Sequence, residues 1–126
     1  MPGTDDIGDT GAVLREVMDR WKAGIDAQRP KEVAAVFTTD AVFQGLQPYG
    51  VGRTTVADYY LGQAPGMKVG YAMLQTRRPA ADVALGYLRA TFSWPDGHTV
   101  TAYIGVVVTR GTDGWSIAQY QASAIG

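Results

Sequence analysis

Several residue types that build common functional sites are scarce or missing in this chain. Its 126 residues include no cysteine and one histidine, which excludes disulfides, thiolate zinc sites and histidine-rich metal sites. Eleven basic and twelve acidic residues nearly cancel, so no basic surface for nucleic acid is expected. The longest strongly apolar run, 102–108, is too short to cross a bilayer. We therefore expect no metal, no cofactor, and neither a nucleic-acid nor a membrane partner.

The N-terminal segment shows no sign of a secretory signal. It begins Met-Pro-Gly-Thr-Asp-Asp and lacks a basic region followed by an apolar one. A cytoplasmic location is the resulting expectation. Residues 1–9 are rich in Gly and Asp and are predicted to form a flexible arm, while residues 10–126 are long enough for one domain with its own core.

Helical periodicity dominates the first half of the chain. Apolar residues recur at helical spacing after Thr10, on one face of a first helix: Leu14, Met18, Trp21 and Ile25. Pro30 suits the first turn of a second helix, which is expected to end near 38–40. A short strand over 41–43 follows, and a third helix is predicted from Thr54 or Thr55 through Leu61.

The second half reads as a meander of long strands. Four runs separated by turn residues are predicted as strands: 68–78, 83–94, 98–110 and 115–125. Pro95-Asp96-Gly97 is a strong hairpin signal, because Pro presets one turn residue and Gly supplies positive φ. Acidic residues from Met67 onward occur only at turns, so the strands carry no carboxylate for acid–base catalysis. This order predicts an α+β fold in which a curved sheet wraps around helices and leaves a cavity between them.

Both faces of the predicted sheet are apolar. On 83–94, Leu88 and Phe92 lie on one face, and Leu85 and Tyr87 lie on the other. One face packs on the helices, so the second needs another cover. We expect a homodimer formed through this outer sheet face.

Two glutamines are candidate ligand contacts on the last strand. Gln119 and Gln121 share strand parity with Trp115 and Ile117, whose size favours the inner face. Buried amides need partners, which leaves a polar ligand, a structural network or an interface as alternatives. Glutamine does not titrate, so neither residue could shuttle protons.

The other candidates are aromatic or charged side chains. Arg89 lies in mid-strand, where it could bind a ligand oxygen or face solvent or an interface. His98 is the one imidazole, but its place directly after a turn predicts an exposed, incidental residue. Aromatic residues complete the set of pocket candidates, since phenols can donate hydrogen bonds to a ligand: Trp21, Tyr49, Tyr59, Tyr60, Tyr71, Tyr87 and Tyr103. No catalytic residue is assigned.

Three segments carry a resemblance to a known superfamily. They are 36–43 (VFTTDAVF), 51–60 (VGRTTVADYY) and 113–123 (DGWSIAQYQAS). In this order they resemble the NTF2-like superfamily, in its SnoaL-like and DUF4440 branches, and most of all the SgcJ/EcaC family associated with enediyne and polyketide biosynthesis. The resemblance implies a cystatin-like cone with three N-terminal helices on a strongly curved, mostly antiparallel sheet that encloses a pocket.

The departures from the superfamily bear on activity. Ketosteroid isomerase-like members carry a carboxylate base at a position that corresponds here to about Gly45, and many DUF4440-like sequences carry histidines where this chain has Gln119 and Gln121. The resemblance therefore implies a pocket for a hydrophobic polyketide-like compound and leaves its use open. One reading is an accessory protein or a cofactor-independent cyclase, isomerase or dehydratase. The alternative is a non-catalytic dimeric ligand-binding or protein-interaction domain.

Overall fold

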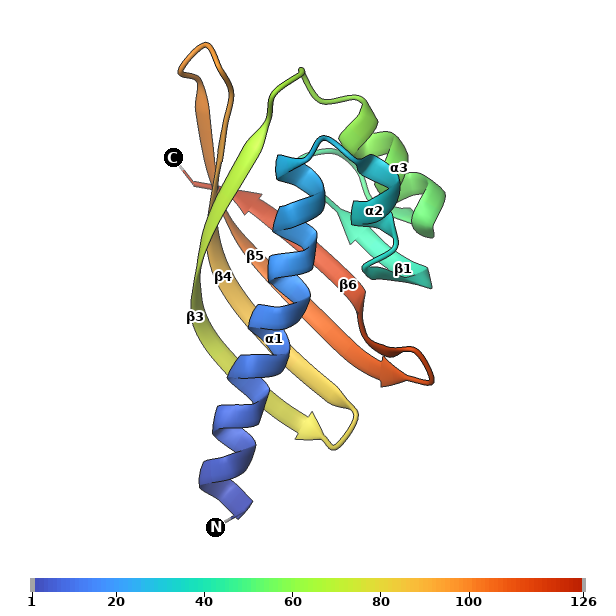
Figure 1. The fold of residues 1–126 in the computed structure, drawn as a ribbon, viewed down its shortest axis with the longest axis vertical. Helices are drawn as coiled ribbons and strands as arrows, with labels where there is room; N and C mark the ends of the chain where they lie inside the picture. Colours follow the sequence, from blue (N-terminus) through green and yellow to red (C-terminus); the bar gives the residue numbers. More distant parts are fainter. Residues whose placement is uncertain (1, 126) are drawn as a thin grey trace.

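A long N-terminal helix lies along the hollow face of a curved sheet (Figure 1). The computed structural model describes the backbone of residues 2–125 and the side chains of residues 10–125. Its helices are α1 (Pro2–Asp26), α2 (Pro30–Ala34) and α3 (Arg53–Leu61). Within the described residues no helix is both long enough and apolar enough to cross a membrane. The α1 backbone includes most of the segment expected to be a loose arm; the side chains of 1–9 lie outside the described residues, and the division at residue 9 stays a prediction.

The second helix is shorter than the sequence suggested. It ends at Ala34, and strand β1 already begins at Phe37. The residues that follow the helix include Val36, Thr38 and Thr39, and β-branched side chains favour the extended backbone. The expected strand over 41–43 is therefore only the second half of β1.

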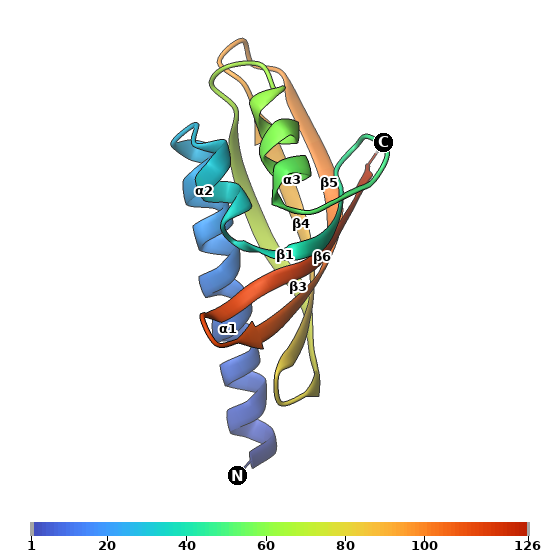
Figure 2. The same cartoon turned by 90° about the vertical axis from the view of Figure 1, so that its right-hand side faces the viewer.

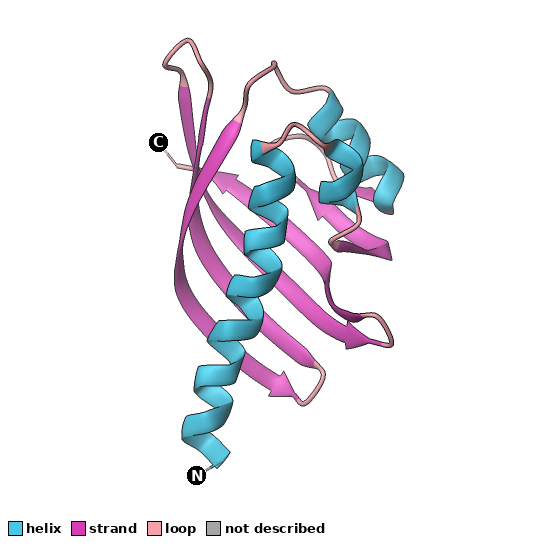
Figure 3. Ribbon diagram, viewed as in Figure 1, coloured by secondary structure: helices cyan, strands magenta, loops and turns pink. Residues whose placement is uncertain are grey.

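One sheet of six strands forms the other layer (Figure 3). The strands run in the spatial order β2-β1-β6-β5-β4-β3, and only β1 and β6 are parallel. The expectation of four C-terminal strands in a mostly antiparallel sheet is confirmed, whereas the two-residue β2 was missed. Their bounds are β1 Phe37–Gln44, β2 Gly50–Val51, β3 Lys68–Ala80, β4 Val83–Ser93, β5 Thr99–Gly111 and β6 Gly114–Ala124.

Aromatic packing fills the space between α1 and the sheet. The fully buried Trp21 of α1 lies edge-on to Phe92 at 6.1 Å between ring centroids, and 6.0 Å from Tyr120. Its indole N–H donates to the Tyr60 hydroxyl at 3.0 Å. Apolar side chains of the inner sheet face, such as Leu88 and Ile104, are likewise fully buried. The expectation of a cavity between helices and sheet is therefore wrong for this central region, which is core.

Polar side chains at the end of α1 fasten the start of β3. Asp26 Oδ1 accepts the Val69 N–H at 3.0 Å, and Lys22 Nζ donates to the Val69 carbonyl at 2.8 Å. Gln28 has a left-handed backbone with φ of 60°; its amide donates to the Met67 carbonyl at 2.6 Å and accepts the Gly66 N–H at 2.9 Å. These contacts fix the path of the chain just before β3.

A β-bulge at Ala118 reverses the side-chain alternation of β6. Ile117 pairs with Val108 and Gln119 with Val107, so Ala118 is an extra residue between two consecutive pairs. Ile117 is buried on the inner face, but Gln119 beyond the bulge is exposed on the outer face. The predicted inner-face position of Gln119, and with it Gln121, is wrong for this reason.

Burial controls the ionisation of the two core tyrosines. Desolvation raises the pKa of Tyr60 and of Tyr120 well above the usual value of 10.0, because the phenolate would lie in an apolar interior. Hydrogen bonds from Trp21 and Tyr120 partly oppose the shift at Tyr60. In unfolded chain both phenols ionise near pH 10, so their neutral forms stabilise the fold fully below that pH and progressively less above it.

Replacing Tyr120 with Phe is expected to make the fold less sensitive to alkali. Each such tyrosine lowers the free energy of unfolding by about 1.4 kcal/mol per pH unit above about pH 10. Urea unfolding between about pH 9 and 12 should give Tyr120→Phe a slope against pH that is shallower by roughly this amount. The exposed Tyr49 provides the control, since Tyr49→Phe should keep the wild-type slope. Identical slopes for Tyr120→Phe and wild type would contradict the prediction.

Candidate functional site

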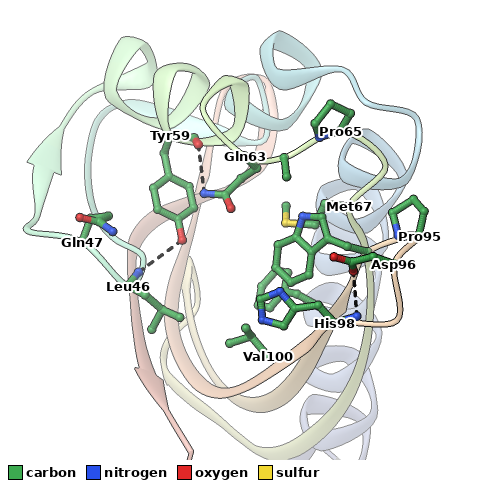
Figure 4. A pocket seen from close by; sticks show the side chains of 13 residues that line it. Leu46, Gln47, Tyr59, Gln63, Pro65, Met67, Pro95, Asp96, His98 and Val100 are labelled. Atoms are coloured by element: carbon green, nitrogen blue, oxygen red, sulfur yellow. Dashed lines mark hydrogen bonds between the residues drawn. The ribbon is translucent and has the colours of Figure 1, made fainter.

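A pocket of about 580 Å³ opens at one end of the cone, between α3 and the β4–β5 turn (Figure 4). In the side view α3 lies beside the upper part of β4 and β5, above the neighbouring strands β1 and β6 (Figure 2). We call it the cone-end pocket. Its walls come from the loop after β1, from α3 and the segment after it, and from the β4–β5 hairpin: Leu46, Gln47, Tyr59, Gln63, Ala64, Pro65, Met67, Phe92, Trp94, Pro95, Asp96, His98 and Val100.

The floor of the cone-end pocket is the inner face of the sheet where the core ends. Phe92 points inward on β4 and pairs with Val100 on β5, and Trp94 follows one residue after the end of β4. All three line the pocket, so the apolar inner face of the sheet meets it here. Met67 closes the inner wall (Figure 4).

Tyr59 places a hydroxyl at the wall opposite the hairpin (Figure 4). The ring packs against Phe43 at 5.1 Å and over Gly45, where an added Cβ would lie 2.4 Å from the ring. The hydroxyl oxygen accepts the Leu46 N–H at 3.3 Å, which leaves its own O–H to donate. Gln63 extends from the end of α3 and donates to the Tyr59 carbonyl at 3.3 Å.

The β4–β5 turn brings an imidazole and an indole together. The rings of His98 and Trp94 stack with centroids 4.9 Å apart at 20°. Asp96 Oδ1 accepts the His98 backbone N–H at 2.9 Å, and Gly97 adopts a φ of 92°, so the turn holds His98 in place. The Trp94 indole nitrogen is itself buried and has no hydrogen-bond partner among the described residues, so Trp94 offers the pocket its apolar ring.

The charge of the cone-end pocket is low. Asp96 is the one carboxylate among its described lining residues, and no Lys or Arg lines it. An apolar floor with a phenol, amides and an imidazole at its edge suits a neutral hydrophobic ligand that carries oxygen. Among the described residues no three His, Cys, Asp or Glu side chains cluster as a metal ion would require.

Five of the predicted pocket residues lie on the helix side of the sheet or on the loop after β1, and one of them lines the cone-end pocket. That one is Tyr59; Trp21 and Tyr60 belong to the core, and Tyr49 is exposed on the loop. Tyr71 donates to Asp19 at 2.6 Å, and partial burial followed by this bond raises its pKa. It therefore joins β3 to α1 and does not line the pocket.

The other five predicted residues lie together on the outer face. They are Tyr87, Arg89, Tyr103, Gln119 and Gln121, all exposed. Tyr87 and Tyr103 stack at 5.6 Å, and Tyr87 lines a shallow hollow of about 410 Å³ with both glutamines. They lie outside the cone-end pocket, because strand register and the Ala118 bulge turn them away from the helices, and their role as ligand contacts stays a prediction.

Sequence reasoning missed most of the pocket that the structure contains. His98 is exposed as predicted, but its ring forms part of the pocket wall, as do Trp94 and Gln63. The available signal was the Pro-Asp-Gly turn itself, which brings Trp94 and His98 to facing ends of a hairpin. That turn could be read from the sequence, but the approach of α3 to it could not.

Adding a methyl group at Gly45 is expected to displace Tyr59. The Cβ of Gly45→Ala would meet the Tyr59 ring, so we expect a loss of about 1–3 kcal/mol in the free energy of unfolding. In a Tyr59→Ala background the same substitution should cost much less, and urea unfolding of the four proteins measures this coupling. Gly70→Ala is the control, because a Cβ there meets nothing within 4 Å. Equal costs of Gly45→Ala in both backgrounds would contradict the proposed contact.

Comparison with known proteins gives a consistent fold. The family described as SnoaL-like domain matches residues 11–123. A domain with a cystatin-like fold from Nostoc punctiforme is 17% identical, with a TM-score of 0.81 over 94% of this chain and 78% of that one. An NTF2-like protein with a cystatin-like fold from Novosphingobium aromaticivorans is 13% identical, with a TM-score of 0.82 over 98% and 87%. These likenesses show an α+β, NTF2-like cone, as the sequence predicted.

A third solved structure carries a functional description. The ketosteroid isomerase-like protein from Erwinia carotovora atroseptica is 22% identical, with a TM-score of 0.74 over 91% of this chain and 95% of that one. At this identity the likeness concerns the fold alone. No curated protein matches the chain.

Proposed function

Because the chain belongs to the family of SnoaL-like domains, we propose that its cone-end pocket binds a hydrophobic, oxygen-bearing small molecule. The observation that carries this proposal is an apolar hollow of about 580 Å³ whose edge holds the Tyr59 phenol, with its O–H left to donate, and the His98 imidazole. These groups match a ring compound with carbonyl or hydroxyl oxygens.

The substrate class we propose is a polyketide-like compound in natural-product biosynthesis. The resemblance of segments 36–43, 51–60 and 113–123 to the DUF4440 and SgcJ/EcaC sequences supports this assignment. The low charge of the pocket is compatible with such molecules, because a carboxylate or phosphate ligand would find no Lys or Arg on the described walls. The pathway role is thus either catalysis or binding of an intermediate.

The geometry favours a cofactor-independent proton transfer of the isomerase, cyclase or dehydratase type. His98 would remove a proton from a carbon beside a ligand carbonyl and return it to another position as the double bond shifts. Tyr59 O–H, held by the Leu46 N–H, would donate a hydrogen bond to the carbonyl oxygen as it gains negative charge. The net change is an isomerisation that needs no oxidant or reductant.

Replacing His98 with Gln separates catalysis from binding. We expect Gln to keep a hydrogen-bonding side chain without a titrating proton, so turnover should fall about 10²–10⁴-fold. The measurement starts with a ligand-shift screen of aromatic polyketides and polyenes, followed by product analysis with each compound that binds. Arg89→Ala, on the outer face, is the control that should match wild type.

The outcome decides between the enzyme and its alternative. Turnover by wild type that persists in His98→Gln would rule out His98 as the acid–base group. Saturable binding without any product from wild type would favour the non-catalytic ligand-binding domain. Failure of every hydrophobic compound to shift pocket resonances would overturn the pocket proposal itself.

We also propose that a second copy of the chain covers the outer sheet face. Exposed apolar side chains lie there on β1, β3, β4 and β5: Val42, Leu74, Tyr87 and Tyr103. The parallel Tyr87–Tyr103 stack gives this face a flat aromatic centre, and Gly105 beside it leaves the hollow that a partner side chain could enter. A two-fold interface would place the same patch on both copies.

Placing a charge at the centre of this face is expected to separate the copies. Tyr87→Glu would bury two carboxylates in an apolar interface, and should shift the mass measured by light scattering from dimer to monomer. Tyr49→Glu adds the same charge to an exposed loop residue and should leave the mass unchanged. A wild-type protein that is monomeric at about 100 µM would refute the interface, given the affinity expected of a standard dimer.

A further inference from the structure

A second, smaller pocket lies behind the inner wall of the cone-end pocket. It has a volume of about 210 Å³ and is formed by the end of α1, by α2 and by the last turn of α3. We call it the α2-side pocket. Four residues of the segment 63–67 line both pockets: Gln63, Ala64, Pro65 and Met67. The wall between them is therefore a single stretch of chain, which we call the strap.

Hydrogen bonds hold the backbone of the strap in place, whereas the side chain of Met67 can change its conformation. Gln28 binds the backbone at Gly66 and Met67 with hydrogen bonds of 2.9 and 2.6 Å. Gly66 adopts a φ of 87°, and a Cβ there would lie 2.5 Å from Pro95, so the strap also contacts the β4–β5 turn. Met67 is the most buried of the four shared residues, with 5% of its surface exposed. Its unbranched thioether has three rotatable bonds and rearranges more easily than the backbone.

The α2-side pocket offers an apolar surface. Its polar residues already have partners: Arg29 pairs with Glu32 at 2.9 Å, and the Gln28 amide is used by the strap. Gln63 donates to the Tyr59 carbonyl. Tyr60, one of the predicted pocket residues, also lines this pocket, and its hydroxyl accepts the Trp21 indole N–H. The rest of the lining is chiefly aliphatic, from Ile25, Pro30, Val33, Leu61 and Met67. An alkyl or polyene chain suits this space better than a charged or strongly polar group.

We infer that Met67 determines ligand length, by opening the cone-end pocket to the α2-side pocket so that the protein accepts a ring with an apolar chain attached. The inference rests on the proposed function, since the ring must first occupy the cone-end pocket. The ring oxygens meet Tyr59 and His98, and the chain passes Met67 toward Ile25 and Val33. Met67 is in this sense a specificity-determining residue.

Methyl NMR with phenol and 4-hexylphenol tests where each part of the ligand lies. Val100 reports on the cone-end pocket alone, while Ile25 and Val33 report on the α2-side pocket alone. We expect both compounds to shift Val100 saturably, and only 4-hexylphenol to shift Ile25 and Val33. Shifts of Val100 alone with both compounds overturn the length inference and leave the proposed function standing. No shift of Val100 with either compound overturns the proposed function, and the inference with it.

Substitution of Met67 gives an independent measure. Each methylene removed from water tightens Kd by about fourfold, so the hexyl chain should bind at least about tenfold more tightly than the ethyl chain of 4-ethylphenol. A Phe at 67 is bulkier and stiffer, and Met67→Phe should reduce this ratio to about threefold or less. Val51→Phe, at an exposed position that lines neither pocket, should keep the wild-type ratio. An unchanged ratio in folded Met67→Phe contradicts the inference.

Discussion

The aromatic packing around Trp21 is the constraint on which the rest of the molecule depends. Its ring occupies the centre of the cone, against Phe92 and Tyr120, and its N–H is satisfied by Tyr60. A buried indole needs such a partner, so the contact fixes the distance and the rotation of α1 relative to α3. With α1 held there, the interior between helix and sheet is solid.

A solid centre moves the usable space to the end of the cone. The apolar surface at the inner side of the sheet continues from the core through Phe92, Trp94 and Val100 into the cone-end pocket. The pocket is then bounded by loops and a hairpin turn, which is where polar groups are easily placed. The one imidazole of the described residues, that of His98, accordingly lies on a turn at the pocket wall.

The β-bulge at Ala118 determines which side chains of β6 lie on the inner face of the sheet and which lie on the outer face. If Ala118 took part in regular strand alternation, Gln119 and Gln121 would point inward with Ile117 and add amides to the core. The bulge lets Ile117 and Tyr120 both be buried and sends the glutamines outward to the Tyr87–Tyr103 stack. The same bulge therefore keeps the core apolar and places both amides on the outer face.

Local patterns in the sequence determined the elements of this protein, because periodicity and turn chemistry act between residues close in the chain. The stripe from Leu14 to Ile25 marked α1, and Pro95-Asp96-Gly97 marked the β4–β5 turn. Matching segments at 36–43 and 113–123 indicated the cone. The position of the candidate site could be read only from the tertiary structure. The Ala118 bulge is set by pairing with β5. Tyr59, Met67 and His98 line one pocket because of how tightly side chains 30 or more positions apart in the chain fill the core. Local sequence patterns do not show how completely side chains fill the space between helices and sheet. The same sequence patterns are therefore compatible with a pocket in the middle of the cone and with a pocket at its end, and the packing of the aromatic rings decides between them.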